Sequence, residues 1–222
     1  MIREIPGPAG RLEILLDEPE SAPRAAAVFA HPHPRYGGTM HHKVVYRGAK
    51  ALKDIGCAVL RFNFRGTGTS AGTFADGRGV MDGFRAGLDF VSDRYSGVET
   101  WAAGFSFGAW VALTVGAVDE RVSLLIGIAP PTESYDFADV RRSQKPKFFI
   151  HGERDEVAPL KAMRGFYAHL VEPKELVVID AADHLFDGKV GEVGDAIEDL
   201  LGDYGPGVVA RGPGFGRPSS RL

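Results

Sequence analysis

The feature that most constrains the fold is a regular alternation of short apolar runs with longer amphipathic segments. The apolar runs predict buried strands, which cover residues 11–16, 25–30, 57–62, 100–104, 122–128, 147–150 and 175–179. The amphipathic segments predict helices, which cover residues 43–55, 79–95, 106–118, 159–170 and 190–201. Because a parallel connection needs a crossover and a helix can supply it, this order favours an α/β fold: a mostly parallel sheet with helices on both faces.

Length and composition favour one folded domain with a short tail. Apolar residues make up 44% and charged residues 25% of the 222-residue chain, close to the averages for globular proteins. The composition shifts only near the end, where Gly and Pro are frequent and no periodic pattern remains. We therefore expect a domain over residues 1–202 and a flexible tail over residues 203–222. An arm that packs on a neighbouring subunit, in a homodimer, stays open as an alternative for this tail.

Charge and cysteine usage narrow the class of protein. The net charge is −3, from 26 basic and 29 acidic residues, and the basic residues are scattered, which argues against nucleic acid as a partner. Cys57 is the only cysteine, so it forms no internal disulfide, and its apolar surroundings predict a buried residue. The sequence has no signal-peptide pattern and no apolar stretch long enough to span a bilayer. We expect a cytoplasmic protein that does not bind membranes.

The strongest local motif is Gly104-Phe105-Ser106-Phe107-Gly108, which matches G-x-S-x-G between an expected strand and an expected helix. A serine at such a turn lies at the carboxyl end of the sheet, beside a helix N-terminus that stabilises negative charge. Ser106 is therefore the candidate nucleophile. The alternative is a glycine-rich turn with an ordinary helix-capping serine.

A serine hydroxyl needs a base, and the base needs an orienting acid. Asp155 follows the expected strand 147–150, and His184 follows the expected strand 175–179. Both therefore lie at the same rim as Ser106, in the chain order nucleophile, acid, histidine that this motif requires. Three residue types in the right order, each after a strand, favour a Ser-His-Asp triad over coincidence.

Other side chains compete for the same roles. His151 also follows a strand but precedes the candidate acid, so a structural role is preferred for it. Asp183 adjoins His184, and a sequence neighbour rarely orients an imidazole ring. Glu153 and Glu156 are weaker alternatives for the acid.

Acyl transfer also requires hydrogen-bond donors for the oxyanion. The first is the backbone amide after the nucleophile, that of Phe107. The second is expected in residues 31–38, the loop after the strand 25–30. The two prolines of this loop have no amide hydrogen. The amide of His33 is therefore the best-placed donor and that of Tyr36 is the second choice.

Several of these segments together form a wider pattern, which consists of His31-Pro32-His33-Pro34, Tyr36-Gly37-Gly38, Lys43-Val44-Val45, Phe62-Asn63-Phe64-Arg65-Gly66, Gly104-Phe105-Ser106-Phe107-Gly108 and His151-Gly152-Glu153-Arg154-Asp155. With these motifs the chain resembles small lidless bacterial α/β hydrolases related to dienelactone hydrolases, over residues 10–202. The resemblance implies an α/β-hydrolase fold and carboxylesterase activity on small esters, without a metal or cofactor. Dienelactone hydrolases use a cysteine nucleophile where this chain has Ser106, so their lactone specificity does not carry over. The chain also departs from the family pattern at His41 and His42, where acidic or amide residues are expected.

Other functions fit parts of the sequence less well. Residues 66–71 match a dinucleotide-binding fingerprint, but further glycines follow where a helix should begin. His31, His33, His41 and His42 lack the spacing of familiar zinc sites. A peptidase or thioesterase of the same fold, and a ligand-binding relative without activity, stay open as alternatives.

The site is expected to be open and small. Residues 129–146, where this fold usually carries a lid, suffice for a turn and one short helix. Tyr36, Phe105 and Phe186 are expected to form a shallow apolar wall near the serine, suited to a small-molecule ester with a short acyl group.

Overall fold

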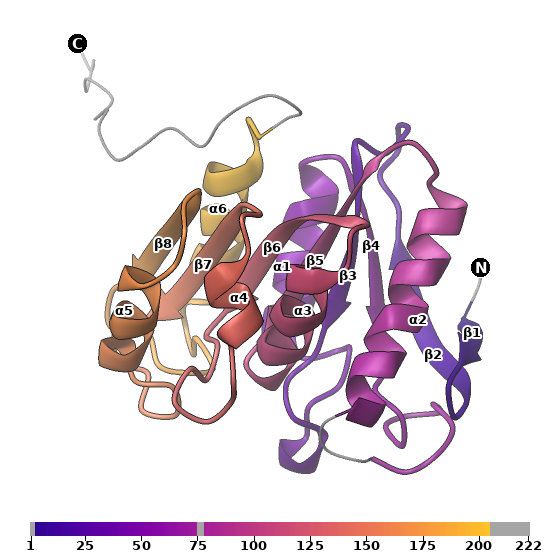
Figure 1. Cartoon of the computed structure of the whole chain (residues 1–222), viewed down its shortest axis with the longest axis horizontal. Coiled ribbons are helices and arrows are strands. Elements are labelled where there is room, and N and C mark those ends of the chain that lie inside the picture. Colours follow the sequence, from indigo (N-terminus) through magenta and orange to yellow (C-terminus); the bar gives the residue numbers. More distant parts are fainter. Residues whose placement is uncertain (1–2, 75–77, 205–222) are drawn as a thin grey trace.

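A computed structural model describes residues 3–74 and 78–204, which form an eight-stranded sheet in the order β1-β2-β4-β3-β5-β6-β7-β8 (Figure 1). The strands are β1 (Glu4–Gly7), β2 (Gly10–Asp17), β3 (Ala25–Ala30), β4 (Cys57–Phe62), β5 (Glu99–Phe105), β6 (Val122–Ile128), β7 (Lys147–Gly152) and β8 (Lys174–Ile179). β2 pairs antiparallel with β1 and β4, and the other neighbours pair in parallel. The predicted α/β fold with a mostly parallel sheet is confirmed. Most of the predicted tail, from residue 205 onwards, lies outside the described residues.

Helices cover both faces of this sheet (Figure 1). They are α1 (Lys43–Asp54), α2 (Arg78–Arg94), α3 (Phe107–Val118), α4 (Ala138–Arg142), α5 (Leu160–Ala168) and α6 (Val190–Leu201), with a short 3₁₀ helix, η1, at Pro34–Tyr36. Side chains of α1 and α6 share one apolar core, and those of α2 to α5 share the other. Alternate residues of β3 enter the two cores, which explains why this strand reads as a continuous apolar run. None of the described helices is long and apolar enough to cross a membrane.

The segment between β6 and β7 contains one short helix, α4, and no covering domain. Trp110 of α3 donates its indole N–H to the carbonyl oxygen of Asp136, which fastens this segment down on the neighbouring helix. The prediction that the fold carries no lid is confirmed. The loops after the parallel strands meet along one edge, the lower edge of the sheet in Figure 1, and no helix or strand of the described residues covers that edge.

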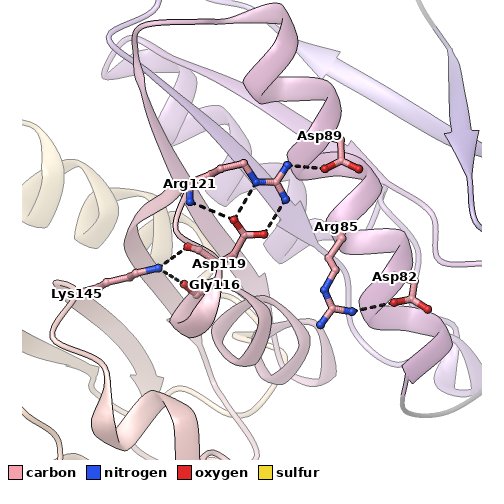
Figure 2. A network of polar contacts seen from close by, with 7 residues as sticks. All are labelled: Asp82, Arg85, Asp89, Gly116, Asp119, Arg121 and Lys145. Carbon is pink, nitrogen blue, oxygen red and sulfur yellow. Dashed lines mark hydrogen bonds and ion pairs between the residues drawn. The ribbon is translucent and has the colours of Figure 1, made fainter.

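At the opposite edge, polar contacts fasten the end of α3 (Figure 2). Arg121 pairs with Asp119 at 2.7 Å and also with Asp89 of α2. Lys145 donates from Nζ to the carbonyl oxygens of Gly116 and Asp119, at 2.7 Å and 2.5 Å. Lys145 thus satisfies carbonyls that a helix C-terminus leaves without partners, while Arg121 ties the Asp119 carboxylate to α2. The helix that begins beside Ser106 is thus held at both ends.

Candidate active site

Ser106 is the single residue between β5 and α3, and its backbone is strained. Its φ of 54° and ψ of −120° lie in a region that residues with side chains rarely adopt. Its amide donates to the carbonyl oxygen of Ile128 at 2.8 Å, which ties the turn to β6. A Cβ on Gly104 would lie 2.2 Å from the carbonyl oxygen of Gly108, and one on Gly108 would lie 2.4 Å from that of Ala30. Both glycines of the motif are therefore needed for the chain to turn this tightly.

The three side chains that the sequence singled out lie in a hydrogen-bonded line. Ser106 Oγ is 2.9 Å from His184 Nε2, and His184 Nδ1 is 2.7 Å from Asp155 Oδ2. They come from the loops after β5, β8 and β7, which meet at the same edge of the sheet. Asp155 and His184 are both buried, and the direct 2.7 Å contact leaves no room for water between their side chains.

Hydrogen bonds around Asp155 determine where the imidazole carries its proton. Asp155 Oδ1 accepts the amides of Val157 at 2.9 Å and Ala158 at 2.7 Å, so the carboxylate is fixed by its own loop. Oδ2 is then the acceptor that faces His184 Nδ1, which must be the protonated nitrogen. Nε2 is left as an acceptor for the Ser106 hydroxyl. This is the arrangement required of a general base.

The loop after β3 lies beside the nucleophile turn. The rings of His33 and Phe107 pack with centroids 4.6 Å apart, and His33 Nδ1 accepts the amide of Arg35 at 3.2 Å. Phe107 is the first residue of α3, so its amide has no acceptor within the helix. The Tyr36 amide, the second choice as an oxyanion donor, instead donates to the carbonyl oxygen of His33 at 3.0 Å. This leaves Phe107 and His33 as the candidate pair.

His31 holds this loop in place from its buried side. It is fully buried, accepts the amide of Phe64 at Nε2 (3.1 Å), and donates from Nδ1 to the carbonyl oxygen of Pro32 (2.7 Å). Burial lowers the pKa of His31 to about 3, so the ring is neutral at physiological pH and the hydrogen-bond pattern is maintained. The position of the loop is therefore set by a buried imidazole and not by the prolines alone.

An apolar cavity of about 520 Å³ opens beside Ser106. Its walls come from the loops after β3, β5, β6, β7 and β8 and include Tyr36, Phe105, Phe107, Tyr135, Val157 and Leu185. Tyr36 stands at the mouth with 88% of its surface exposed. The cavity can hold a small substrate against the serine, and nothing in the described residues closes over it.

Comparisons with known proteins place this geometry in a family. No family model matches the chain. The uncharacterized protein RP471 of Rickettsia prowazekii is 34% identical over 204 residues, which are 88% of this chain and 86% of that protein. An α/β serine hydrolase homologue from Coxiella burnetii has a TM-score of 0.84 and 37% identity, covering 89% of this chain and 96% of its own. The chain belongs to the α/β serine hydrolase family.

Within the α/β serine hydrolases, the resemblance extends to members without a lid. XC6422 from Xanthomonas campestris, an α/β serine hydrolase without a lid, has a TM-score of 0.82 and 36% identity, and the match covers 88% of this chain and 90% of XC6422. The short α4 segment of this hydrolase agrees with that architecture. The family is thus established over nearly all of the described chain.

The prediction that Phe186 lines the pocket of the hydrolase is wrong. Tyr36 and Phe105 line the cavity, but Phe186 does not: its side chain is fully buried and packs behind Phe105, with ring centroids 6.3 Å apart. The Phe186 backbone is left-handed (φ 53°), and its amide closes a turn on the carbonyl oxygen of Asp183. This turn sends the Phe186 side chain into the core, while Leu185 faces the cavity instead.

The competing acidic residues of the hydrolase have other partners. Asp183 accepts the amide of Asp187 at 2.9 Å, and Glu153 accepts that of Ala181 at 2.8 Å.

His151 lies closer to the site than its assignment as a structural residue implied. Its Nε2 is 3.6 Å from Asp155 Oδ2 and donates to the carbonyl oxygen of Ala158 at 2.7 Å.

Burial lowers the pKa of His151, so the ring is neutral and adds no charge beside Asp155. Its Nδ1 is buried and has no hydrogen-bond partner within residues 3–74 and 78–204. His151 therefore supports the Asp155 loop from inside, and the carboxylate is left to His184.

Several residues that line the cavity were not predicted from the sequence, namely His42, Pro131, Ser134, Tyr135, Val157 and Leu185. A usable signal existed for most of them, because they follow β6 or adjoin Asp155 and His184 along the chain. His42 gave no such signal, because it lies just before a helix and does not directly follow a strand. No group of three or more His, Cys, Asp or Glu side chains within residues 3–74 and 78–204 is arranged to hold a metal ion.

Proposed function

We propose that this hydrolase cleaves carboxylic esters with small acyl groups through an acyl-enzyme formed on Ser106. The observation that carries the proposal is the hydrogen-bonded line from Ser106 Oγ to His184 Nε2 (2.9 Å) and from His184 Nδ1 to Asp155 Oδ2 (2.7 Å). A neutral imidazole that accepts the hydroxyl proton converts a weak nucleophile into an effective one.

In the proposed first half-reaction, Ser106 Oγ attacks the ester carbonyl carbon as its proton passes to His184 Nε2. The carbonyl oxygen becomes an oxyanion, to which the amides of Phe107 and His33 donate. The charge at the N-terminus of α3 favours the same oxyanion. His184 then gives its proton to the ester oxygen, and the alcohol leaves.

In the second half-reaction, water takes the place of the alcohol. His184 accepts a proton from the water, which attacks the acyl carbon, and the carboxylic acid leaves as Ser106 recovers its proton. Asp155 stays ionised throughout and stabilises the imidazolium that forms in each half. This route requires only side chains and amides of the chain itself, so the proposal includes no metal or cofactor.

The proposal also includes the more distant relation to dienelactone hydrolases that the motifs suggest. Ser106 stands where those enzymes have a cysteine, so their lactone specificity does not carry over to this chain. We therefore propose simple esters, and not dienelactones, as the substrate class.

A panel of acyl donors with one acyl group tests the substrate class. Butyrate presented as a p-nitrophenyl ester, a thiocholine thioester and a p-nitroanilide should be hydrolysed with the ester fastest in kcat/KM. Dominant cleavage of the thioester would instead indicate a thioesterase, and dominant cleavage of the anilide an amidase or peptidase. A folded protein inactive on all three would be a binding protein.

A further inference from the structure

His42 is held in the cavity wall in one orientation. It is the N-cap residue of α1, and its Nδ1 accepts the amide of Val44 at 3.3 Å. The ring stacks on Phe105, with centroids 5.1 Å apart and planes at 29°. The cap and the stack together fix the imidazole beside the nucleophile strand.

The cap also determines which nitrogen of His42 carries the proton. Because Nδ1 accepts, the neutral ring is protonated at Nε2. Burial, with the nearby charges of Lys43 and His184, lowers the pKa of His42 to about 4, so this neutral form prevails at physiological pH. Nε2 has no hydrogen-bond partner among the described residues. His42 thus presents an available N–H donor at the cavity.

This donor lies on the side of the cavity where the alcohol leaves. Phe105 contacts the ring of His184 as well as that of His42, with centroids 5.4 Å apart in the His184 contact. Lys43, next to His42, forms an ion pair with Asp187, next to the His184 turn. The oxyanion candidates instead come from the loop after β3 and the start of α3. Since His184 must reach the leaving oxygen to protonate it, groups beside His184 face the alcohol.

The surface that continues past His184 carries charged side chains. A second hollow of about 440 Å³ shares Val157, His184 and Leu185 with the apolar cavity. Its other walls are Arg154, Glu156 and Asp183. An alcohol that carries oxygen atoms suits these surroundings better than a hydrocarbon alcohol does.

We infer that His42 is a specificity-determining residue, which donates Nε2–H to an acceptor oxygen on the alcohol part of the ester. The substrate class is then esters of alcohols that bear an ether, hydroxyl or carbonyl oxygen near the ester bond. This inference rests on the proposed ester hydrolysis and adds to it the chemistry of the alcohol.

Two pairs of isosteric esters isolate this contact. 2-Methoxyethyl butyrate and n-butyl butyrate differ by one ether oxygen on the alcohol, and n-butyl methoxyacetate and n-butyl butyrate differ by one on the acyl group. The ratio of kcat/KM within each pair, compared between variants, cancels the intrinsic reactivity of the esters. A pH-stat titration of the released acid measures the hydrolysis of all three esters.

Three variants separate the donor of His42 from its cap. His42→Asn keeps an acceptor near the position of Nδ1 and loses the donor, whereas His42→Gln keeps a donor near the position of Nε2 and loses the cap. His42→Phe keeps the stack on Phe105 and loses both hydrogen bonds. His41→Ala, at the exposed neighbouring residue, is the control.

We expect His42→Asn and His42→Phe to lower the alcohol-pair ratio by about 3- to 10-fold, the range of one hydrogen bond, and to leave the acyl-pair ratio within about twofold. His42→Gln should keep the alcohol-pair ratio. It should lower Tm by a few degrees, because the loss of an N-cap lowers the free energy of unfolding. An unchanged alcohol-pair ratio in His42→Asn, or a change confined to the acyl pair, would overturn the inference while ester hydrolysis stands. A wild-type protein that hydrolyses none of the three esters would refute the proposed function itself.

Discussion

At the scale of single residues, the proposed chemistry depends most on Asp155. In Asp155→Asn the amides of Val157 and Ala158 still need an acceptor, so the new side chain must turn its oxygen toward them. Its NH₂ group then faces His184 Nδ1, which forces the imidazole proton onto Nε2, where it blocks proton transfer from Ser106. We expect kcat for p-nitrophenyl butyrate to fall by about 10⁴-fold with the fold intact.

Asp183→Asn is the matched control for this variant, because Asp183 caps its own loop and does not hold the ring. Its kcat should stay within about threefold of the wild type. Steady-state assays of the two variants side by side give the ranking, and the reverse order would move the acid role to Asp183.

His33 tests the second oxyanion donor. Its φ of −58° is one that proline adopts, so His33→Pro removes the amide hydrogen without a change of backbone conformation at this residue. We expect His33→Pro to lower kcat by roughly 10²-fold or more. His33→Ala keeps the amide and should lose less, although the missing ring no longer accepts from Arg35 or packs on Phe107. Equal losses in assays of both variants would assign the effect to the imidazole.

Much of the site was predictable from residue order because parallel strands deliver their carboxyl ends to one edge. Ser106, Asp155 and His184 each follow a strand, so the sequence alone placed them together. The direction of a side chain within a turn was not predictable in the same way. Leu185 and Phe186 are both apolar neighbours of His184, and only the left-handed backbone at Phe186 decides which one enters the core.

At the scale of elements, the buried strands were easier to predict than the strand at the edge of the sheet. β3, β4 and β6 match their apolar runs to the residue, because both faces of these strands are covered. β1 was missed because Glu4–Gly7 contains Pro6 and Gly7 and buries one residue, Ile5. An edge strand that pairs on one side needs no apolar run, so its sequence carries no such signal.

The contacts of Figure 2 allow a prediction about α3. Lys145→Met removes the Nζ donor to the carbonyl oxygens of Gly116 and Asp119 and keeps the apolar stem. We expect a loss of about 1–2 kcal/mol in the free energy of unfolding, since two helix-terminal carbonyls lose a charged partner. Urea denaturation followed by circular dichroism measures it.

Arg85→Met is the control in the same view. Arg85 pairs with Asp82 one turn away on the surface of α2, and such exposed pairs contribute less than about 0.5 kcal/mol. Equal destabilisation by the two variants would show that Lys145 contributes nothing special to the end of α3.

At the scale of the whole molecule, the absence of a lid limits the substrate. A long acyl chain gains roughly 0.8 kcal/mol per buried CH₂ only if the protein surrounds it. Here the cavity is open, and its rim residues Tyr36 and Val157 are 88% and 65% exposed. We expect p-nitrophenyl esters to show their highest kcat/KM at about two to six acyl carbons, without activation at a lipid–water interface. A maximum near twelve carbons would reveal an acyl groove outside the described residues or on a second subunit.

The central claim, that Ser106 is the nucleophile of this hydrolase, is tested most directly by covalent labelling. A fluorophosphonate probe phosphonylates a serine that a neighbouring base has activated, and mass spectrometry of the digested protein locates the adduct. We predict one adduct, on the peptide that contains Ser106, and none in Ser106→Ala, which should keep its Tm and lose about 10⁶-fold in kcat. An unlabelled wild-type protein, an adduct on another residue, or substantial turnover by pure Ser106→Ala would contradict the account.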